Sequence, residues 1–129
     1  MASAAKYTAQ KVVVDGFDVL RLADTARKTE ISIAPTFGNN AYEFKVNGRN
    51  ILWAPFTLKQ LQVKPAFVGT PLMAPWANRL DGDAFQANGK RYLLNPGFGN
   101  VVRDDNGRPI HGLLVFSSQW KVHSLEADV

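Results

Sequence analysis

Three residues whose side chains suit sugar recognition lie close together in the stretch PLMAPWANRLDGDAFQANGKRYLL. Trp76, Asn78 and Arg79 follow two prolines and precede an Asp-Gly turn, so we expect them on a loop. An Arg fork can donate paired hydrogen bonds to vicinal hydroxyls or to a carboxylate, and a Trp ring can stack on a sugar face. Structural alternatives exist for both. Arg79 can form a surface salt bridge with Asp81 or Asp83, and Trp76 can fill the core.

Two histidines are the other residues of interest. His111 lies between a proline and a glycine in GRPIHGLL, so we expect it on an accessible loop, where it can donate to a ligand hydroxyl or ring oxygen. A solvated or turn-bonded side chain is the alternative. His123 alternates with Trp120 and Val122 along a predicted strand, which turns it to the opposite face. We therefore expect no functional role for His123.

The acidic residues do not suggest a catalytic pair or a metal site. Asp81, Asp83, Asp104 and Asp105 lie in glycine-containing turns, where Asp is favoured because it bonds the local backbone. The run RDDNG lacks both the spacing and the distal Glu of a calcium loop. The sequence contains no phosphate-binding loop, dinucleotide fingerprint or nucleophile elbow. We therefore expect no metal and no cofactor.

Composition narrows the class of protein. The chain has 129 residues, a mass of 14.2 kDa and no cysteine, which predicts a single domain without disulfides. The net charge of +4 comes from scattered basic residues, so nucleic acid is not the expected partner. No apolar run reaches the roughly 20 residues that span a bilayer, and no signal peptide is recognisable. We expect a cytoplasmic protein with no membrane association.

Alternating apolar and polar residues predict an antiparallel all-β protein of about seven to nine short strands. Hairpin turns are predicted at Asp15-Gly16, Asn47-Gly48 and Asn88-Gly89. We expect Tyr42, Phe44 and Val46 to share one face of a strand, Ile31 and Ile33 to point inward, QWKVHSL to form a strand, and residues 57–62 to form one helical turn that ends before Pro65. A sandwich fits this pattern better than a small closed barrel.

The last predicted strand ends without a polar tail, which predicts an unpaired sheet edge. Such an edge allows self-association. It also suggests that residues 1–129 form a single β-sandwich region that is part of a longer domain. Half of a continuous sandwich would expose apolar surface that its other half covers.

The order and spacing of these motifs resemble the N-terminal half of the aldose 1-epimerase (galactose mutarotase) family, from about Ile31 onward. The resemblance rests on an ordered set of residues: Pro75, Asn78, Arg79, Phe85, Asn88, Gly89, Lys90, Tyr92, Leu94, His111, Gly112 and Trp120. One departure is Leu113, which replaces a second glycine found after the His-Gly of many relatives. That difference predicts a loop of another shape and leaves a phosphosugar or a non-galactose sugar as alternative substrates.

The resemblance implies a galactose mutarotase-like supersandwich, of which this chain is an incomplete N-terminal portion. Its concave face would bind a hexose such as galactose or glucose and interconvert the α and β anomers by acid–base ring opening. Arg79 would hold sugar hydroxyls beside Asn78, His111 would position the substrate, and Trp76 would form part of the wall. In the family the catalytic acid and base come from the C-terminal half, so we identify no catalytic residue here and expect the 129-residue chain to be inactive. A non-catalytic carbohydrate-binding sandwich and a phosphosugar epimerase-like fragment are the alternatives.

Overall fold

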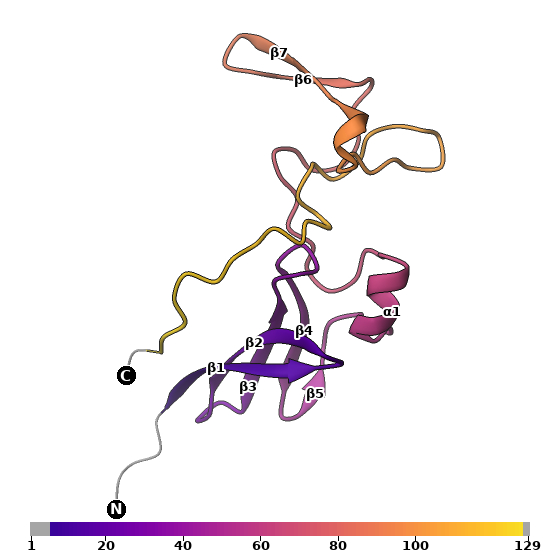
Figure 1. Ribbon diagram of the computed structural model, residues 1–129. Helices are drawn as coiled ribbons and strands as arrows, with labels where there is room; N and C mark the ends of the chain where they lie inside the picture. The colour runs from indigo at the N-terminus through magenta and orange to yellow at the C-terminus, as the bar shows by residue number, and fades with distance from the viewer. Residues whose placement is uncertain (1–5, 128–129) are drawn as a thin grey trace, which may run out of the picture.

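Antiparallel strands make up most of the regular structure in the computed structural model, which describes residues 6–127 (Figure 1). Five consecutive strands form one sheet in the order β1-β2-β3-β4-β5, and two more form the separate hairpin β6-β7. The elements are β1 (Tyr7–Val14), β2 (Phe17–Asp24), β3 (Thr29–Ala34), β4 (Asn40–Val46), β5 (Arg49–Asn50), α1 (Leu58–Val63), β6 (Ala84–Ala87), β7 (Lys90–Leu93) and the 3-10 turn η1 (Pro96–Phe98). The predicted all-β antiparallel class is confirmed, and the architecture is consistent with a sandwich-like fold.

All three predicted hairpin turns are present. Each is a two-residue turn in which both residues have positive φ, the geometry that suits the right-handed twist of the flanking strands. The φ values are 55° and 90° at Asp15-Gly16, 50° and 79° at Asn47-Gly48, and 51° and 71° at Asn88-Gly89. Asn, Asp and Gly tolerate this conformation better than other residues, so these turns set the strand register locally.

The core lies between one face of the five-stranded sheet and α1. Val19 and Ala34 of the sheet are fully buried and form a cluster with Leu58 and Leu61 of the helix. The helical turn predicted over residues 57–62 is present as α1, and it begins in a capping box in which Thr57 and Gln60 bond each other's backbone N–H groups. The Leu58 N–H also donates to the carboxylate of Asp15 (3.0 Å), which ties the helix to the first hairpin turn.

The predicted inward direction of Ile31 and Ile33 is wrong. Ser32 and Ala34 are the fully buried residues of β3, while Ile31 pairs with Phe44 on the opposite face. That face is also apolar, so alternation alone could not tell which face the helix would cover.

The register of β4 likewise corrects the prediction that Tyr42 and Phe44 share a face. Glu43 pairs with Ser32 and Ala41 with Ile33, so Tyr42 has no partner residue on β3. Such a bulge shifts the alternation by one residue. Tyr42 therefore belongs to the core beside the helix, whereas Phe44 borders a cavity on the other face.

The predicted strand QWKVHSL is absent, since residues 118–127 contain no strand. This segment runs back along the five-stranded sheet towards β1 (Figure 1), and its Glu126 borders the same cavity as Leu22 and Phe44. An alternating segment becomes a strand only when a neighbouring strand supplies hydrogen-bond partners, and no strand within residues 6–127 pairs with it. Among all the described residues, 6–127, no helix is long and apolar enough to cross a membrane.

Burial of Tyr42 gives a prediction about alkaline stability. Desolvation raises the pKa of this phenol from 10.0 to about 12, because the charged form is disfavoured inside the protein. The folded protein therefore holds the proton more tightly than the unfolded chain. This contribution to stability is complete below about pH 10 and is lost as the pH rises through about 12.

We expect Tyr42→Phe, which keeps the ring, to resist urea better than the unmodified protein at about pH 11. At about pH 8 we expect the difference in urea resistance between the two proteins to be smaller. Tyr92→Phe is the matched control, because Tyr92 is 41% exposed in the β6-β7 hairpin and should leave the alkaline loss unchanged. Parallel loss of stability in the Tyr42→Phe variant and the unmodified protein would contradict the burial argument.

Candidate functional site

Two loops that are distant in the sequence are joined by backbone hydrogen bonds. Residues 74–80 and 109–113 lie side by side: the Leu113 N–H donates to the Ala74 carbonyl (2.7 Å), and the Leu80 N–H donates to the Pro109 carbonyl (2.9 Å). Gly112 sits at the closest approach, with φ of 77° and a Cβ position that would be 2.2 Å from the Ala74 oxygen. Only a residue without a side chain fits there, so this glycine permits the junction.

His111 and Asn78 contact each other twice across this junction. The His111 N–H donates to the Asn78 carbonyl (2.9 Å), and the Asn78 N–H donates to the imidazole Nδ1 (3.2 Å). An Nδ1 that accepts a hydrogen bond carries no proton, so a neutral imidazole holds its proton on Nε2. The ring edge also packs against Phe67, with centroids 4.8 Å apart. His111 is therefore held in place and presents an Nε2–H donor.

Arg79 is held by two neighbours. Its Nε donates to the Asp104 carboxylate (2.5 Å) and its Nη1 donates to the Asn78 side-chain oxygen (3.1 Å). Within the described chain Nη2 donates to no protein group, so it remains available to a ligand. The guanidinium is about half exposed, whereas the Asp104 side chain is only 8% exposed. A buried carboxylate thus orients an accessible cation.

Asp104 is fixed by its own loop. Its second carboxylate oxygen accepts hydrogen bonds from the N–H groups of Asn106 (3.0 Å) and Arg108 (2.9 Å). The hydrogen bond from Arg79 and then the one from the Arg108 N–H hold the pKa of this carboxyl below its usual range. Asp104 is therefore charged at neutral pH, and the direction of Arg79 is set by the 103–110 loop.

Arg79 and His111 both line one cleft with a volume of about 410 Å³. Its other lining residues are Phe67, Arg103, Asp104, Asp105, Asn106 and Ile110. Arg103 is already paired, since it donates to the Asp83 carboxylate (2.8 Å) and to the Gly107 carbonyl (2.9 Å). The cleft therefore combines an aromatic edge, two oriented N–H donors and arginines whose charges are offset by aspartates.

Trp76, by contrast, is not among the residues that line the cleft. Its ring packs against Phe85 with centroids 5.5 Å apart, and Phe85 stacks on Tyr92 at 5.1 Å. This stack attaches the β6-β7 hairpin to the 74–80 loop. The structure thus brings Asn78, Arg79 and His111 together and places Trp76 in the packing beneath the hairpin. The exposed His123 also lies outside the cleft.

Two residues of this site gave no sequence signal of their role in it. Asp104 bonds the local backbone as its turn position predicts, but it also accepts from Arg79, for which Asp81 and Asp83 were the expected partners. The partner proved to lie 25 positions away, and no local pattern identifies a contact at that separation. Phe67 carries no sequence signal at all, because one aromatic residue in a loop is equally suited to packing.

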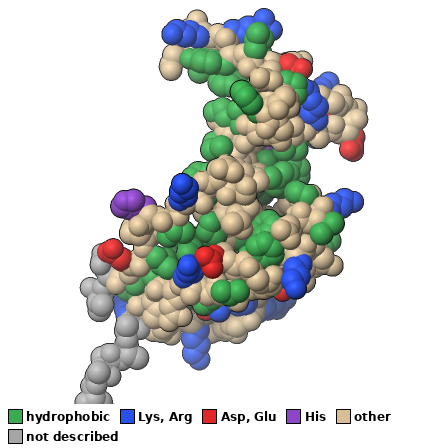
Figure 2. Space-filling view, viewed as in Figure 1, with side chains coloured by type: hydrophobic (Ala, Val, Ile, Leu, Met, Phe, Trp, Pro, Cys, Tyr) green, Lys and Arg blue, Asp and Glu red, His purple; other side chains and the backbone are tan. Residues whose placement is uncertain are grey.

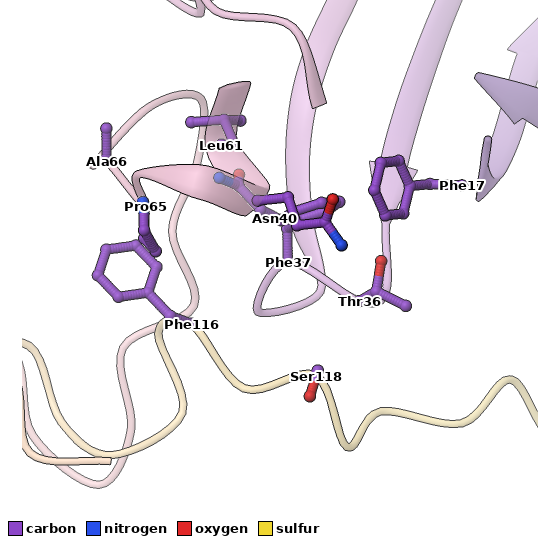
Figure 3. Close-up of a pocket in the computed structure, with 10 residues that line it drawn as sticks. Phe17, Thr36, Phe37, Asn40, Leu61, Pro65, Ala66, Phe116 and Ser118 are labelled. Carbon is purple, nitrogen blue, oxygen red and sulfur yellow. The ribbon is translucent and has the colours of Figure 1, made fainter. Parts of the chain in front are cut away.

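A second hollow, of about 370 Å³, lies between the helix, the β3-β4 loop and residues 116–118 (Figure 3). Phe17, Phe37 and Phe116 give it aromatic walls. Its buried polar residue, Asn40, donates to the Val68 carbonyl (2.7 Å) and accepts from the Thr70 N–H (3.0 Å). Because these amide groups are already used to hold loops together, the first cleft is the better candidate for polar ligand recognition.

Comparison with models of known protein families found no match, and a search of curated proteins found none either. Among residues 6–127 there is also no group of three or more His, Cys, Asp or Glu side chains that could hold a metal ion. The functional proposal therefore rests on the residues of the cleft.

The Arg79–Asp104 pair gives a prediction about acid stability. Because the folded-state pKa of Asp104 is lowered, its contribution to stability is complete above the ordinary value of 3.8 and is lost as the pH falls through the lower folded value. We expect Asp104→Asn to be less stable than the unmodified protein at neutral pH, with the difference shrinking as the pH falls below about 4 in urea titrations. Asp81→Asn is the control, since Asp81 is exposed and should leave the profile unchanged. A difference that does not depend on pH would contradict an ion-pair role.

Proposed function

We propose that this chain is the hexose-binding N-terminal part of an aldose 1-epimerase-like isomerase. The observation that carries the proposal is the convergence of Arg79 and His111 on one cleft, each held by a second residue and each with an N–H donor that bonds no group of the described chain. Free N–H donors beside an aromatic edge match the hydroxyl oxygens and apolar faces of a sugar ring. The ordered motif set around these residues supports the family.

The proposed reaction requires one group to remove the proton of the anomeric hydroxyl and another to protonate the ring oxygen. The guanidinium of Arg79 offers N–H donors and no acceptor, so it serves to bind and orient. The buried Asp104 carboxylate is occupied by Arg79 and by two backbone N–H groups, so it is not free to act as a base. The cleft therefore supports substrate binding, and we propose that the acid and base come from residues beyond this chain.

Exposed apolar side chains in and after the β6-β7 hairpin support the same proposal. Leu93 of β7 is 74% exposed and Phe98 of η1 is 78% exposed. Hydrophobic side chains are visible on the surface of this part of the molecule (Figure 2). Apolar surface of this kind suits contact with further protein, as in half of a larger sandwich.

A non-catalytic sugar-binding module is the second candidate, favoured by the presence of oriented donors in a cleft without a free carboxylate pair. A phosphosugar substrate has weaker support. Arg79 and Arg103 are each paired with an aspartate, so neither offers an unbalanced positive charge to a phosphate group.

Polarimetry and NMR titration distinguish these candidates. We expect glucose or galactose at millimolar concentration to shift the resonances of Arg79 and His111, with glucose 6-phosphate binding no more tightly. We expect fresh α-glucose to mutarotate no faster with the 129-residue chain than without it. Absence of any sugar-dependent shift would overturn the binding proposal, and mutarotation at an enzymatic rate would overturn the assignment of the acid and base to other residues.

Arg79→Ala tests the main contact. We expect it to weaken sugar binding about tenfold or more, because a hydrogen bond to a charged group contributes about 1.5–3 kcal/mol. Arg91→Ala is the matched control, since Arg91 is exposed on β7 away from the cleft. Equal sugar affinity in the two variants would remove Arg79 from the site.

A further inference from the structure

An exposed apolar surface lies beside α1, and none of its residues lines the cleft. Trp53 is 68% exposed, Val63 is 86% exposed and Phe56 is 41% exposed, and the Trp53 and Phe56 rings contact each other at 6.2 Å. Phe56, Val63 and Ala66 also line a groove of about 590 Å³, to which Lys59, Gln60 and Lys64 contribute. We name this surface, Trp53 with the lining residues of the groove, the α1 groove.

The attachment of α1 to the sheet does not use the exposed side chains of Trp53 and Val63, whereas Ala66 packs against the core cluster. The inward face of α1 buries Leu58 and Leu61, which suffices to attach the helix to the sheet. Val63 points the other way, where a β-branched residue gives no packing and slightly lowers helix propensity. Aromatic and aliphatic side chains that gather at an exposed groove are typical of a surface that binds another molecule.

The charge of the groove indicates which kind of molecule it binds. Lys59 and Lys64 contribute to the groove, and neither takes part in an ion pair within residues 6–127. The helix itself contains no acidic residue. A second copy of the same groove would bring four lysines together, which like-charge repulsion disfavours. An acidic partner would instead pair with the lysines while its apolar side chains fill the groove.

We propose that the α1 groove binds an acidic amphipathic segment of a partner protein. An apolar anchor such as Leu or Phe enters between Phe56 and Val63, and Glu or Asp residues on either side of the anchor pair with Lys59 and Lys64. This is the groove mode of peptide recognition, in which the apolar face gives affinity and the charged flanks give register and specificity. The groove shares no lining residue with the cleft, so the proposal is independent of the sugar-binding function.

The test uses the full chain and three synthetic peptides. The first carries Leu and Phe on one helical face and Glu on the other, the second has Lys in place of every Glu, and the third has Ala in place of every Leu and Phe. We expect the first peptide alone to shift the amide resonances of residues 57–66 and the indole N–H of Trp53. Equal binding of the Lys peptide, or no shift at α1 with the Glu peptide, would overturn the proposal.

Two variants assign the binding to the groove. We expect Val63→Glu to weaken binding of the Glu peptide about tenfold or more by placing like charge at the centre of the contact. Val13→Glu is the matched control: Val13 is also a highly exposed valine, at 70%, but lies on β1 outside the groove, and we expect unchanged affinity. Equal affinity in the two variants would overturn the proposal. So would a dimer of the unmodified chain that Val63→Glu dissociates in sedimentation, because the occupant would then be a second copy.

Discussion

The Gly112→Ala variant is expected to lose about 3 kcal/mol or more of stability and to lose the ordered cleft. At φ of 77° any residue with a Cβ is strained, and this Cβ would lie 2.2 Å from the Ala74 oxygen. The contact is with backbone on both sides, so no side-chain rotation can relieve it. Separation of the two loops would break both hydrogen bonds between His111 and Asn78, so His111 and the neighbouring Arg79 would no longer be held together.

Gly89→Ala provides a matched comparison. Gly89 has a similar φ of 71°, but its Cβ would meet nothing within 4 Å, so this variant suffers the backbone strain without the collision. Urea unfolding gives the two losses of stability, and the His111 side-chain resonances report the state of the cleft. If Gly112→Ala were no less stable than Gly89→Ala, the close approach of the two loops would be wrong.

Leu58→Ala is expected to cost about 2–5 kcal/mol, the range found when a large buried side chain is truncated and the cavity does not close. Leu58 is 2% exposed and packs in the cluster that joins α1 to the five-stranded sheet. Thermal and urea unfolding measure the loss.

Val63→Ala on the same helix is the control for Leu58→Ala. Val63 is 86% exposed, so its truncation removes almost no burial and slightly improves helix propensity. We expect its stability to stay within about 0.5 kcal/mol of the unmodified protein. Similar losses in the two variants would mean that α1 does not pack through Leu58.

The parts of the fold that were predictable from the sequence are those in which the signal is local. Asp15-Gly16, Asn47-Gly48 and Asn88-Gly89 each carry the residue types that a two-residue turn demands, and Thr57 and Gln60 carry the capping pattern of the helix. In each case the residues that make the structure are neighbours in the chain. The same holds for Asn78 and Arg79, which were predicted as a pair on one loop and are hydrogen-bonded to each other.

The features of the fold and of the site that the sequence did not predict depend on contacts between residues that are far apart in the chain. The partner of Leu58 is Asp15, 43 positions earlier, and the Asn78 N–H meets a ring nitrogen of His111, 33 positions later. Trp76 was expected either to line the sugar site or to fill the core, and in the structure it packs against Phe85 and belongs to neither the cleft lining nor the core cluster. The predicted strand QWKVHSL had the right alternation but no neighbouring strand, and alternation alone cannot supply one.

The meander of the five-stranded sheet has a consequence for folding kinetics. Every strand of that sheet pairs with its neighbour in the chain, so its contacts are short-range and its hairpins can close within about 1–10 μs. The cleft, by contrast, must bring together residues 25 to 33 positions apart. We therefore expect the sheet to belong to the folding nucleus and the cleft to assemble after the rate-limiting step. Substitutions at Gly112 would then mainly accelerate unfolding, whereas substitutions at Val19 would slow folding.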